Sequence, residues 1–230
     1  MSKHGVRVGA VAMTTATLLS VGAATASGAT PTNSPASLST IQTRAAAAIT
    51  ARVNDLNAAS AKINGAKDLG SGTSALLAYV QNDIAPLQQL GQKIAGDTTV
   101  AEAKADTATI FTNYRVLVLV RPAARLAARA DGATNALLPA LTADAAKATA
   151  HVTPANQATL QPLIADLNTQ ISSATTDTTG VATTVLSYSP AGWNANHELL
   201  SASRNSMSAA RSAVAKARSD LQQIRSALRG

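Results

Sequence analysis

A seven-residue repeat governs the fold of this chain: LSASRNSMSAARSAVAKARSDLQQIRSALR, residues 200–229. Small or apolar side chains recur every seven residues, and again three positions further on, with one serine among them. These positions are Leu200, Met207, Val214, Leu221 and Leu228, then Ser203, Ala210, Ala217 and Ile224. Such positions are the a and d sites of a helix that packs along a seam. The stretch therefore predicts a long C-terminal helix, with Ser203 as the polar residue in its seam.

Arginine recurs beside this seam with the same period. The row consists of Arg204, Arg211, Arg218 and Arg225, with Arg229 one turn beyond. At about 1.5 Å per residue, the first four span roughly 30 Å of helix. Residues 204–230 hold six basic side chains against one acid, whereas residues 27–203 hold eleven of each. The row is either the solvated flank of the seam, with arginine stems lying over apolar neighbours, or a contact surface for a polyanion.

Alanine-rich segments with aliphatic residues three and four apart continue upstream, which is helical periodicity. We expect Pro86 to kink a helix, and Val116–Val120 (VLVLV) to be a buried helical turn rather than a short strand. We expect Thr153-Pro154 to start one helix, and Ser189-Pro190 to start the last one, which runs to the C-terminus. Strand-like alternation is missing from the sequence. The predicted class is all-α, an elongated antiparallel bundle of five to six helices with a long C-terminal heptad helix.

The N-terminal segment has the pattern of a secretory signal peptide. A basic start is followed by an uncharged run and by Ala24-Thr25-Ala26, which has small residues where a signal peptidase cleaves. We therefore predict a signal peptide over residues 1–26, a flexible lead-in over 27–37 and one helical-bundle domain over 38–230. An uncleaved membrane anchor is the alternative. No later apolar run is long enough to span a membrane, so no transmembrane segment is expected after cleavage.

Composition excludes several classes of function. With no cysteine, the chain has no disulfide, thiol nucleophile or thiolate metal site. One Trp, three Tyr and one Phe are too few for an aromatic platform that stacks nucleobases. After signal cleavage only His151 and His197 remain as histidines, with no ligand set around them. Gly70-Ser71-Gly72-Thr73 lacks the GK[ST] ending of a phosphate-binding loop and is expected to be a turn. We predict no enzyme, no cofactor and no metal.

Several segments together suggest a relationship. They are the Ala/Thr-rich export signal, IFTNYR (residues 110–115) leading into VLVLVRP, SPAGWNAN (residues 189–196) and the terminal Arg-heptad helix. In this combination the chain resembles a group of uncharacterised secreted, Ala-rich helical proteins of high-GC actinobacteria. The resemblance extends over most of the chain from about Leu38 onward. It implies export, a helical fold and an envelope or extracellular setting, and it brings no catalytic residues.

The leading hypothesis is an exported, non-enzymatic helical protein of the cell envelope or extracellular space. Its partner would be an anionic envelope polymer or lipid headgroups, with no specific nucleic acid, and Arg204, Arg211, Arg218, Arg225 and Arg229 would be the contacts. The alternative is a helical module that carries a small apolar ligand between its helices. In that case the Ala-rich seams and the two aromatic pairs, Phe111 with Tyr114 and Tyr188 with Trp193, would line the pocket. Otherwise these aromatics are expected to plug the ends of the core.

Overall fold

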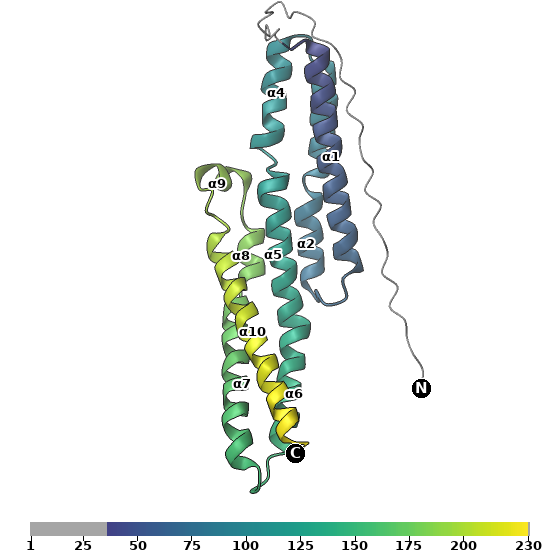
Figure 1. Ribbon diagram of the computed structural model, residues 1–230. Coiled ribbons are helices and arrows are strands. Elements are labelled where there is room, and N and C mark those ends of the chain that lie inside the picture. The colour runs from purple at the N-terminus through teal and green to yellow at the C-terminus, as the bar shows by residue number, and fades with distance from the viewer. Residues whose placement is uncertain (1–35, 230) are drawn as a thin grey trace, which may run out of the picture. The chain divides into compact units, whose positions relative to one another are not determined.

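The computed structural model describes residues 36–229, which belong to one compact unit (Figure 1). All regular elements in this range are helical, and they comprise ten α-helices and two short π-helices. Because several of them follow one another almost without a break, they form six long helical segments. The predicted all-α antiparallel bundle with a long C-terminal helix is confirmed. The predicted signal peptide and most of the lead-in lie outside the described residues.

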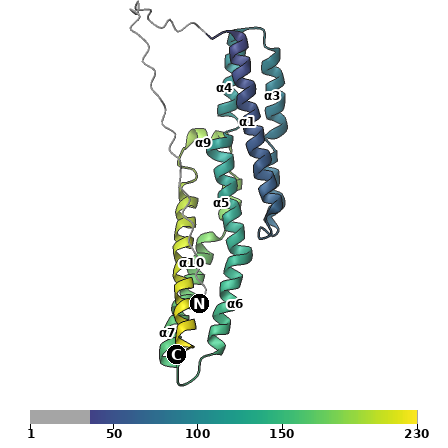
Figure 2. The ribbon, with the colours of Figure 1, turned by 45° about the vertical axis from the view of Figure 1, so that its right-hand side comes forward.

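A continuous helical rod over residues 116–150 extends from the middle of the unit to one of its ends (Figure 2). It consists of η1 (Val116–Val120), α5 (Arg121–Gly132), η2 (Ala133–Leu137) and α6 (Leu138–Ala150). Each π-helix precedes a proline: Arg121 donates to the carbonyl of Val116 before Pro122, and Leu138 donates to that of Ala133 before Pro139. Each proline lacks an N–H, and the wider turn accommodates its ring without ending the rod. The prediction that VLVLV is helical is confirmed, but the turn is buried on one side only, since Leu117 and Val118 are exposed.

The first half of the unit contains four helices, of which the first two also pack against the beginning of the rod. They are α1 (Leu38–Gly65), α2 (Gly72–Gln81), α3 (Ile84–Gly96) and α4 (Val100–Thr112), with α8 (Val181–Leu186) beside α5. The core here consists mainly of large aliphatic side chains. Its fully buried members include Leu56, Leu76, Val80, Leu87, Ile94, Ile110 and Leu119.

The second half is a bundle of α6, α7 (Gln157–Thr178) and α10 (Ser201–Ala227). Helix α10 packs more extensively along α7 than along any other described element. Its seam is largely as predicted: Ser203, Ala210, Val214, Ala217, Leu221 and Ile224 are buried. Two seam positions differ: Met207 is only half-buried, and Leu228 is exposed. Leu228 is exposed because the helix ends one residue earlier, at Ala227. Alanine contributes much of this core, through Ala145, Ala148, Ala174, Ala210, Ala213 and Ala217.

Two predicted helix starts and one kink need correction. The segment around Pro86 is divided into α2 and α3, with the break at Asn82-Asp83, because a proline ring clashes with the carbonyl four residues earlier. Thr153 begins a turn rather than a helix: its N–H donates to the Asn156 side chain, and α7 starts at Gln157. In the predicted turn at 70–73, Gly70 has a φ of 57°, a conformation that favours glycine.

The prediction that the last helix starts at Ser189-Pro190 is wrong. Ser189 caps only the short α9 (Pro190–Ala195), accepting from the Gly192 N–H at 3.1 Å. The chain is extended at Asn196, whose side chain accepts from the N–H of Glu198 at 2.9 Å. This local bond competes with continuation of the helix. Asn194 then attaches α9 to the end of α4, because its amide donates to the carbonyl of Thr112 at 3.0 Å.

Candidate functional site

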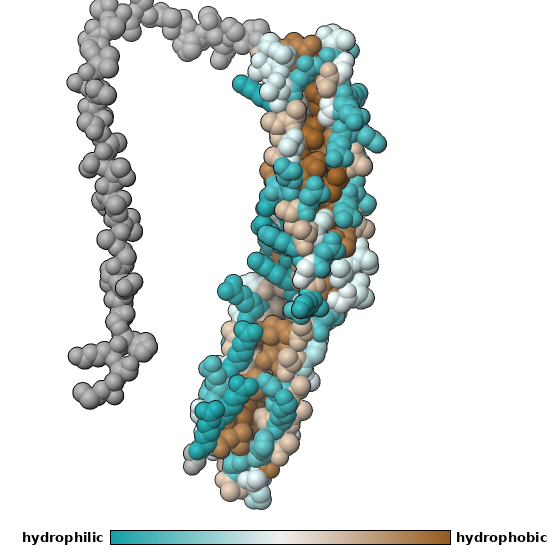
Figure 3. Space-filling view, turned by 90° about the vertical axis from the view of Figure 1, so that its right-hand side faces the viewer, coloured by the Kyte–Doolittle hydropathy of each residue, from teal (hydrophilic) through white to brown (hydrophobic). Residues whose placement is uncertain are grey.

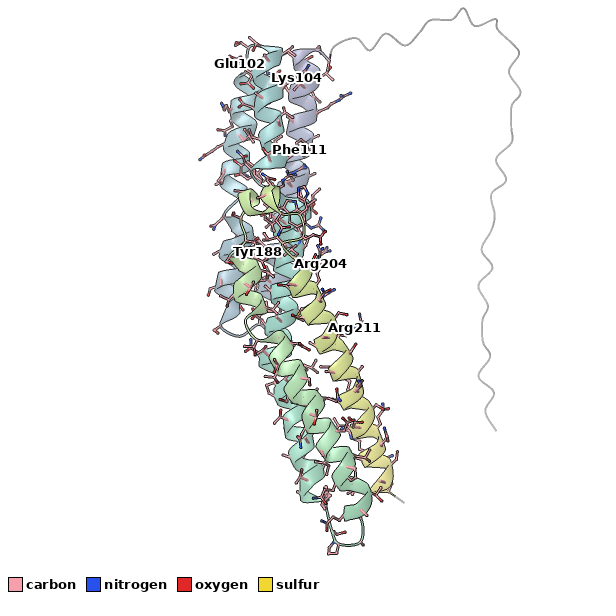
Figure 4. The ribbon with its side chains drawn as sticks, turned by 90° about the vertical axis from the view of Figure 1, so that its left-hand side faces the viewer. Glu102, Lys104, Phe111, Tyr188, Arg204 and Arg211 are labelled. Carbon is pink, nitrogen blue, oxygen red and sulfur yellow. The ribbon has the colours of Figure 1, made fainter. Side chains whose placement is uncertain are left out.

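The predicted arginine row lies on the outer surface of α10. Arg204, Arg211, Arg218, Arg225 and Arg229 are all exposed. Arg204 and Arg211 follow one another along the helix, on the side away from α7 (Figure 4). This orientation follows from the heptad: the buried seam faces α7 and α6, so the position beside it lies at the edge of the contact. The arginine stems can then lie over apolar neighbours while the guanidinium groups reach solvent.

Three of these arginines line a groove together with an arginine from another helix. The groove has a volume of about 660 Å³ and runs between α10 and the segment α5–η2–α6. Its basic lining residues are Arg129, Arg204, Arg211 and Arg218, and no acidic residue lines it. Apolar residues form most of the remaining surface: Leu126, Ala133, Leu137, Leu138, Ala174, Met207, Ala210 and Val214. We call this the arginine groove.

Arg129 is the residue of this site that sequence reasoning missed. It belongs to a row on α5 in which Arg121, Arg125 and Arg129 are four residues apart and therefore share one helix face. Residues 27–203 have no net charge, so a count of charges over that range does not reveal the three arginines on α5. The spacing of four was the signal that could have revealed them. That this row lies near α10 depends on contacts between residues far apart in the sequence.

Ion pairs separate the row into two parts. Arg225 lies 3.2 Å from Asp144 on α6, and the same carboxylate also meets Lys147 at 3.4 Å. For Arg204, Arg211 and Arg218, no acidic side chain of the described residues lies within ion-pair distance. The charge of Arg225 is therefore partly neutralised by Asp144 within the bundle. The charges of Arg204, Arg211 and Arg218 remain available to a ligand.

The acid within α10 lies away from the groove. Asp220 is buried, and its Oδ2 has no hydrogen-bond partner among the described residues. Burial raises the pKa of this carboxyl, and the charge of Asp166 on α7 raises it further, while Lys216 opposes the shift. Since Asp220 does not line the groove, it does not neutralise the arginines there.

The aromatic residues do not form a binding site at the arginine groove. Phe111 is 46% exposed, so the prediction that it plugs the core is wrong. Its ring instead lies under the guanidinium of Arg52, 4.6 Å from the ring centre, which is a cation–π contact. Tyr114, Tyr188 and Trp193 are half-buried and pack against the first core. Phe111 and Tyr188 are labelled in Figure 4.

The two histidines lie apart from the groove. His151 is exposed at the end of α6, and His197 lies in the turn after α9, with its ring 5.7 Å from that of Trp193. Within residues 36–229, no group of three or more acidic or histidine side chains is placed to hold a metal ion. None of the helices in that range is both long and apolar enough to cross a membrane.

Comparisons with known proteins identify no relative. No family model, curated protein or solved structure matches this chain.

Proposed function

We propose that the chain is an exported, non-enzymatic helical protein of the cell envelope or extracellular space that binds an anionic envelope polymer in the arginine groove. The observation that supports this function is the convergence of four guanidinium groups from two helices on one groove without an acid among its lining residues. Arg204, Arg211 and Arg218 would contact the polymer from α10, and Arg129 from α5. Arg225 and Arg229 would extend the contact toward the end of the bundle.

The dimensions of the groove favour a linear ligand. Successive arginines on α10 are about 10 Å apart along the helix, and Arg204 and Arg218 are about 21 Å apart. A chain with repeated phosphate or carboxylate groups can meet several of them at once. Guanidinium groups suit such ligands, because their planar donors match the oxygens of both anions. The apolar lining gives the uncharged parts of the polymer a surface to contact.

The concave shape of the arginine groove also favours a polymer over a membrane as its partner. A bilayer presents its headgroups on a broad surface, which suits a flat or convex protein face. The arginine groove places part of its charge on Arg129, across from α10, where a single chain can reach both sides. Anionic lipid headgroups are therefore the competing partner in the experiment below. The signal-peptide pattern and the resemblance to secreted helical proteins support the envelope setting.

The experiment measures sedimentation of residues 27–230 with cell-envelope fragments from the producing organism. These residues include the entire described unit. The test variant carries Arg204→Gln, Arg211→Gln and Arg218→Gln. The control carries Arg44→Gln, Lys67→Gln and Lys104→Gln, which removes the same charge from exposed positions that do not line the groove. Helicity of each protein is checked by circular dichroism.

We expect the native protein and the control to sediment at low salt and the test variant to remain in solution. If four arginines each neutralise one anionic group, a threefold rise in salt should weaken binding about 20- to 50-fold. After the anionic polymers have been extracted from the fragments, the native protein should no longer sediment with them. If the native protein instead binds anionic lipid vesicles and ignores the extracted polymer, the partner is the membrane surface. Equal loss of binding in the test and control variants would contradict any specific role of the groove.

A further inference from the structure

A second hollow lies on the other side of α5, where this helix faces α1. Its volume is about 290 Å³. Its walls are formed mainly by methyl groups, from Ala58, Ala59, Ile63, Ala66, Leu69, Ala124 and Ala128. We call it the alanine pocket. It is distinct from the arginine groove, although Arg129 lines both.

Alanine is the reason that this space exists. Ala59 of α1 and Ala128 of α5 are half-buried against the first core, and Ala124 is buried. At these positions a leucine would extend into the volume, whereas the methyl group of alanine leaves it open. Ile63 and Leu69 are almost completely buried and form the apolar end of the pocket. The uncharged lining therefore offers a ligand no hydrogen-bonding side chain, which suits an aliphatic chain.

The rim of the alanine pocket is positively charged. Lys62 on α1 and Arg125 and Arg129 on α5 are exposed around it. The lining contains one acid, Asp55, which is already paired with Arg121 at 2.9 Å. No acidic side chain of the described residues lies within ion-pair distance of Lys62, Arg125 or Arg129. An apolar interior with three unpaired cations at its edge is complementary to an aliphatic chain that ends in an anion.

We propose that the alanine pocket binds a single-chain anionic amphiphile, with its aliphatic chain inside and its carboxylate or phosphate among Lys62, Arg125 and Arg129. The site goes beyond the polymer groove and does not depend on it. It also differs from the pocket suggested by the sequence, because no aromatic residue lines it. Figure 3 shows that hydrophobic surface is exposed in strips between hydrophilic side chains along the unit, so apolar contacts are accessible from solvent.

Chain length provides a quantitative expectation. Each methylene group that leaves water should raise the affinity about fourfold until the pocket is full. Beyond that length the affinity should level off, since further carbons remain in solvent. An uncharged alcohol of the same length should bind at least tenfold more weakly, because it cannot use the cations at the rim. A quaternary ammonium amphiphile should bind more weakly still.

The experiment titrates residues 27–230 with decanoate, decyl phosphate, decanol and decyltrimethylammonium, each below its micelle concentration. Methyl NMR of Ile63, Leu69 and the pocket alanines reports the position of the ligand, and calorimetry gives the affinity. One variant, Ala128→Leu, fills the pocket; Ala58→Leu serves the same purpose from an exposed position if the first fails to fold. A second, Lys62→Glu with Arg125→Glu, reverses the rim charge. The matched controls are Ala143→Leu and the double variant Arg44→Glu with Lys104→Glu, at exposed positions outside the pocket.

We expect decanoate or decyl phosphate to shift the pocket methyl signals. The filled variant should abolish the shift, the charge-reversed variant should weaken binding at least tenfold, and both controls should bind normally. Tighter binding of decanoate would identify the natural ligand as a fatty acid, and tighter binding of decyl phosphate would identify it as a phosphate lipid. Binding of decanol as tight as that of decanoate, or unchanged pocket methyl signals, would overturn the proposal.

A further variant separates this site from the proposed polymer function. The protein with Arg204→Gln, Arg211→Gln and Arg218→Gln should lose the envelope polymer and still bind decanoate. The Ala128→Leu variant should lose decanoate and still bind the envelope polymer. If the arginine variant loses decanoate as well, the ligand occupies the arginine groove and the alanine pocket is not the site.

Discussion

The two halves of the described unit are both helical, but large aliphatic side chains predominate in the core of the first and alanine is more frequent in the core of the second. The first half buries residues such as Leu56, Leu76 and Leu87 completely. The second half places Ala145, Ala174 and Ala217 at comparable positions in its core. A leucine has three more carbons than an alanine, so each such position contributes about 2 kcal/mol more hydrophobic stabilisation. Where alanine replaces a larger side chain, the second half relies on close approach of its helices.

In both halves, alanine explains where the binding surfaces can form. Alanine allows two helices to approach closely along a seam and also leaves space where their surfaces diverge. The arginine groove lies beside the alanine-rich part of α10, and the alanine pocket lies where α1 and α5 present alanines to each other. Charged residues surround both hollows. Small side chains thus give up some hydrophobic stabilisation and produce the concave surfaces on which both proposals rest.

The largest change in stability is expected from a substitution in the aliphatic core of the first half. Leu56→Ala should lower the free energy of unfolding by about 3 kcal/mol, because it removes a fully buried side chain and leaves a cavity. Urea unfolding followed by circular dichroism measures the change. Leu117→Ala, at a position that is 47% exposed, is the control and should change stability by less than about 0.5 kcal/mol. Similar losses in the two variants would contradict the assignment of the core.

A smaller effect is expected from enlarging an alanine in the second half. Ala217 is completely buried between α10 and its neighbours, so Ala217→Leu should force the helices apart and cost about 2 kcal/mol. Ala215→Leu, exposed on the same helix, is the matched control and should leave stability nearly unchanged. Both are compared by urea unfolding. A neutral or stabilising effect of Ala217→Leu would mean that this seam is not closely packed.

The smallest effect concerns the buried acid of α10. Burial raises the pKa of Asp220, so the folded state holds its proton more tightly than the unfolded state does. Ionisation of this group therefore destabilises the fold above the raised pKa. As the pH falls through that value toward the ordinary range near 3.9, the penalty disappears. Asp220→Ala should raise stability by about 1 kcal/mol at pH 7, with a gain that shrinks on acidification.

Urea unfolding at several pH values measures this dependence. Asp68→Ala is the control, because Asp68 is exposed. Its effect on stability should be small and nearly independent of pH. If Asp220→Ala destabilises the protein at pH 7, the carboxylate has a favourable partner in solution and the argument from its burial is wrong.

Local signals in the sequence predicted much of the fold. The heptad in α10 identified its buried side, because a helix repeats its faces at fixed spacing whatever it packs against. Ser189-Pro190 misled the prediction of the last helix: the capping signal was real, but the bond of Asn196 to Glu198 ended α9 within two turns. A start signal carries no information about helix length.

The candidate sites were predicted only in part. The row on α10 was visible as a repeat, but its division into a paired Arg225 and available Arg204, Arg211 and Arg218 was not. Phe111 was expected to plug the core because the sequence placed no polar group with it, yet its ring is on the surface against Arg52. Which aromatic residues are buried depends on neighbouring helices, which sequence spacing does not specify.

Sequence patterns alone were enough to predict a helical fold, the buried seam of the long C-terminal helix and the arginines beside that seam. Periodicity and capping signals act over a few residues, so they can be recognised without a structure. The packing of distant helices was needed to show that Arg129 joins the row on α10 and that α1 and α5 enclose an apolar pocket with a cationic rim. These features depend on how distant helices pack and on the space their small side chains leave, which no local pattern contains.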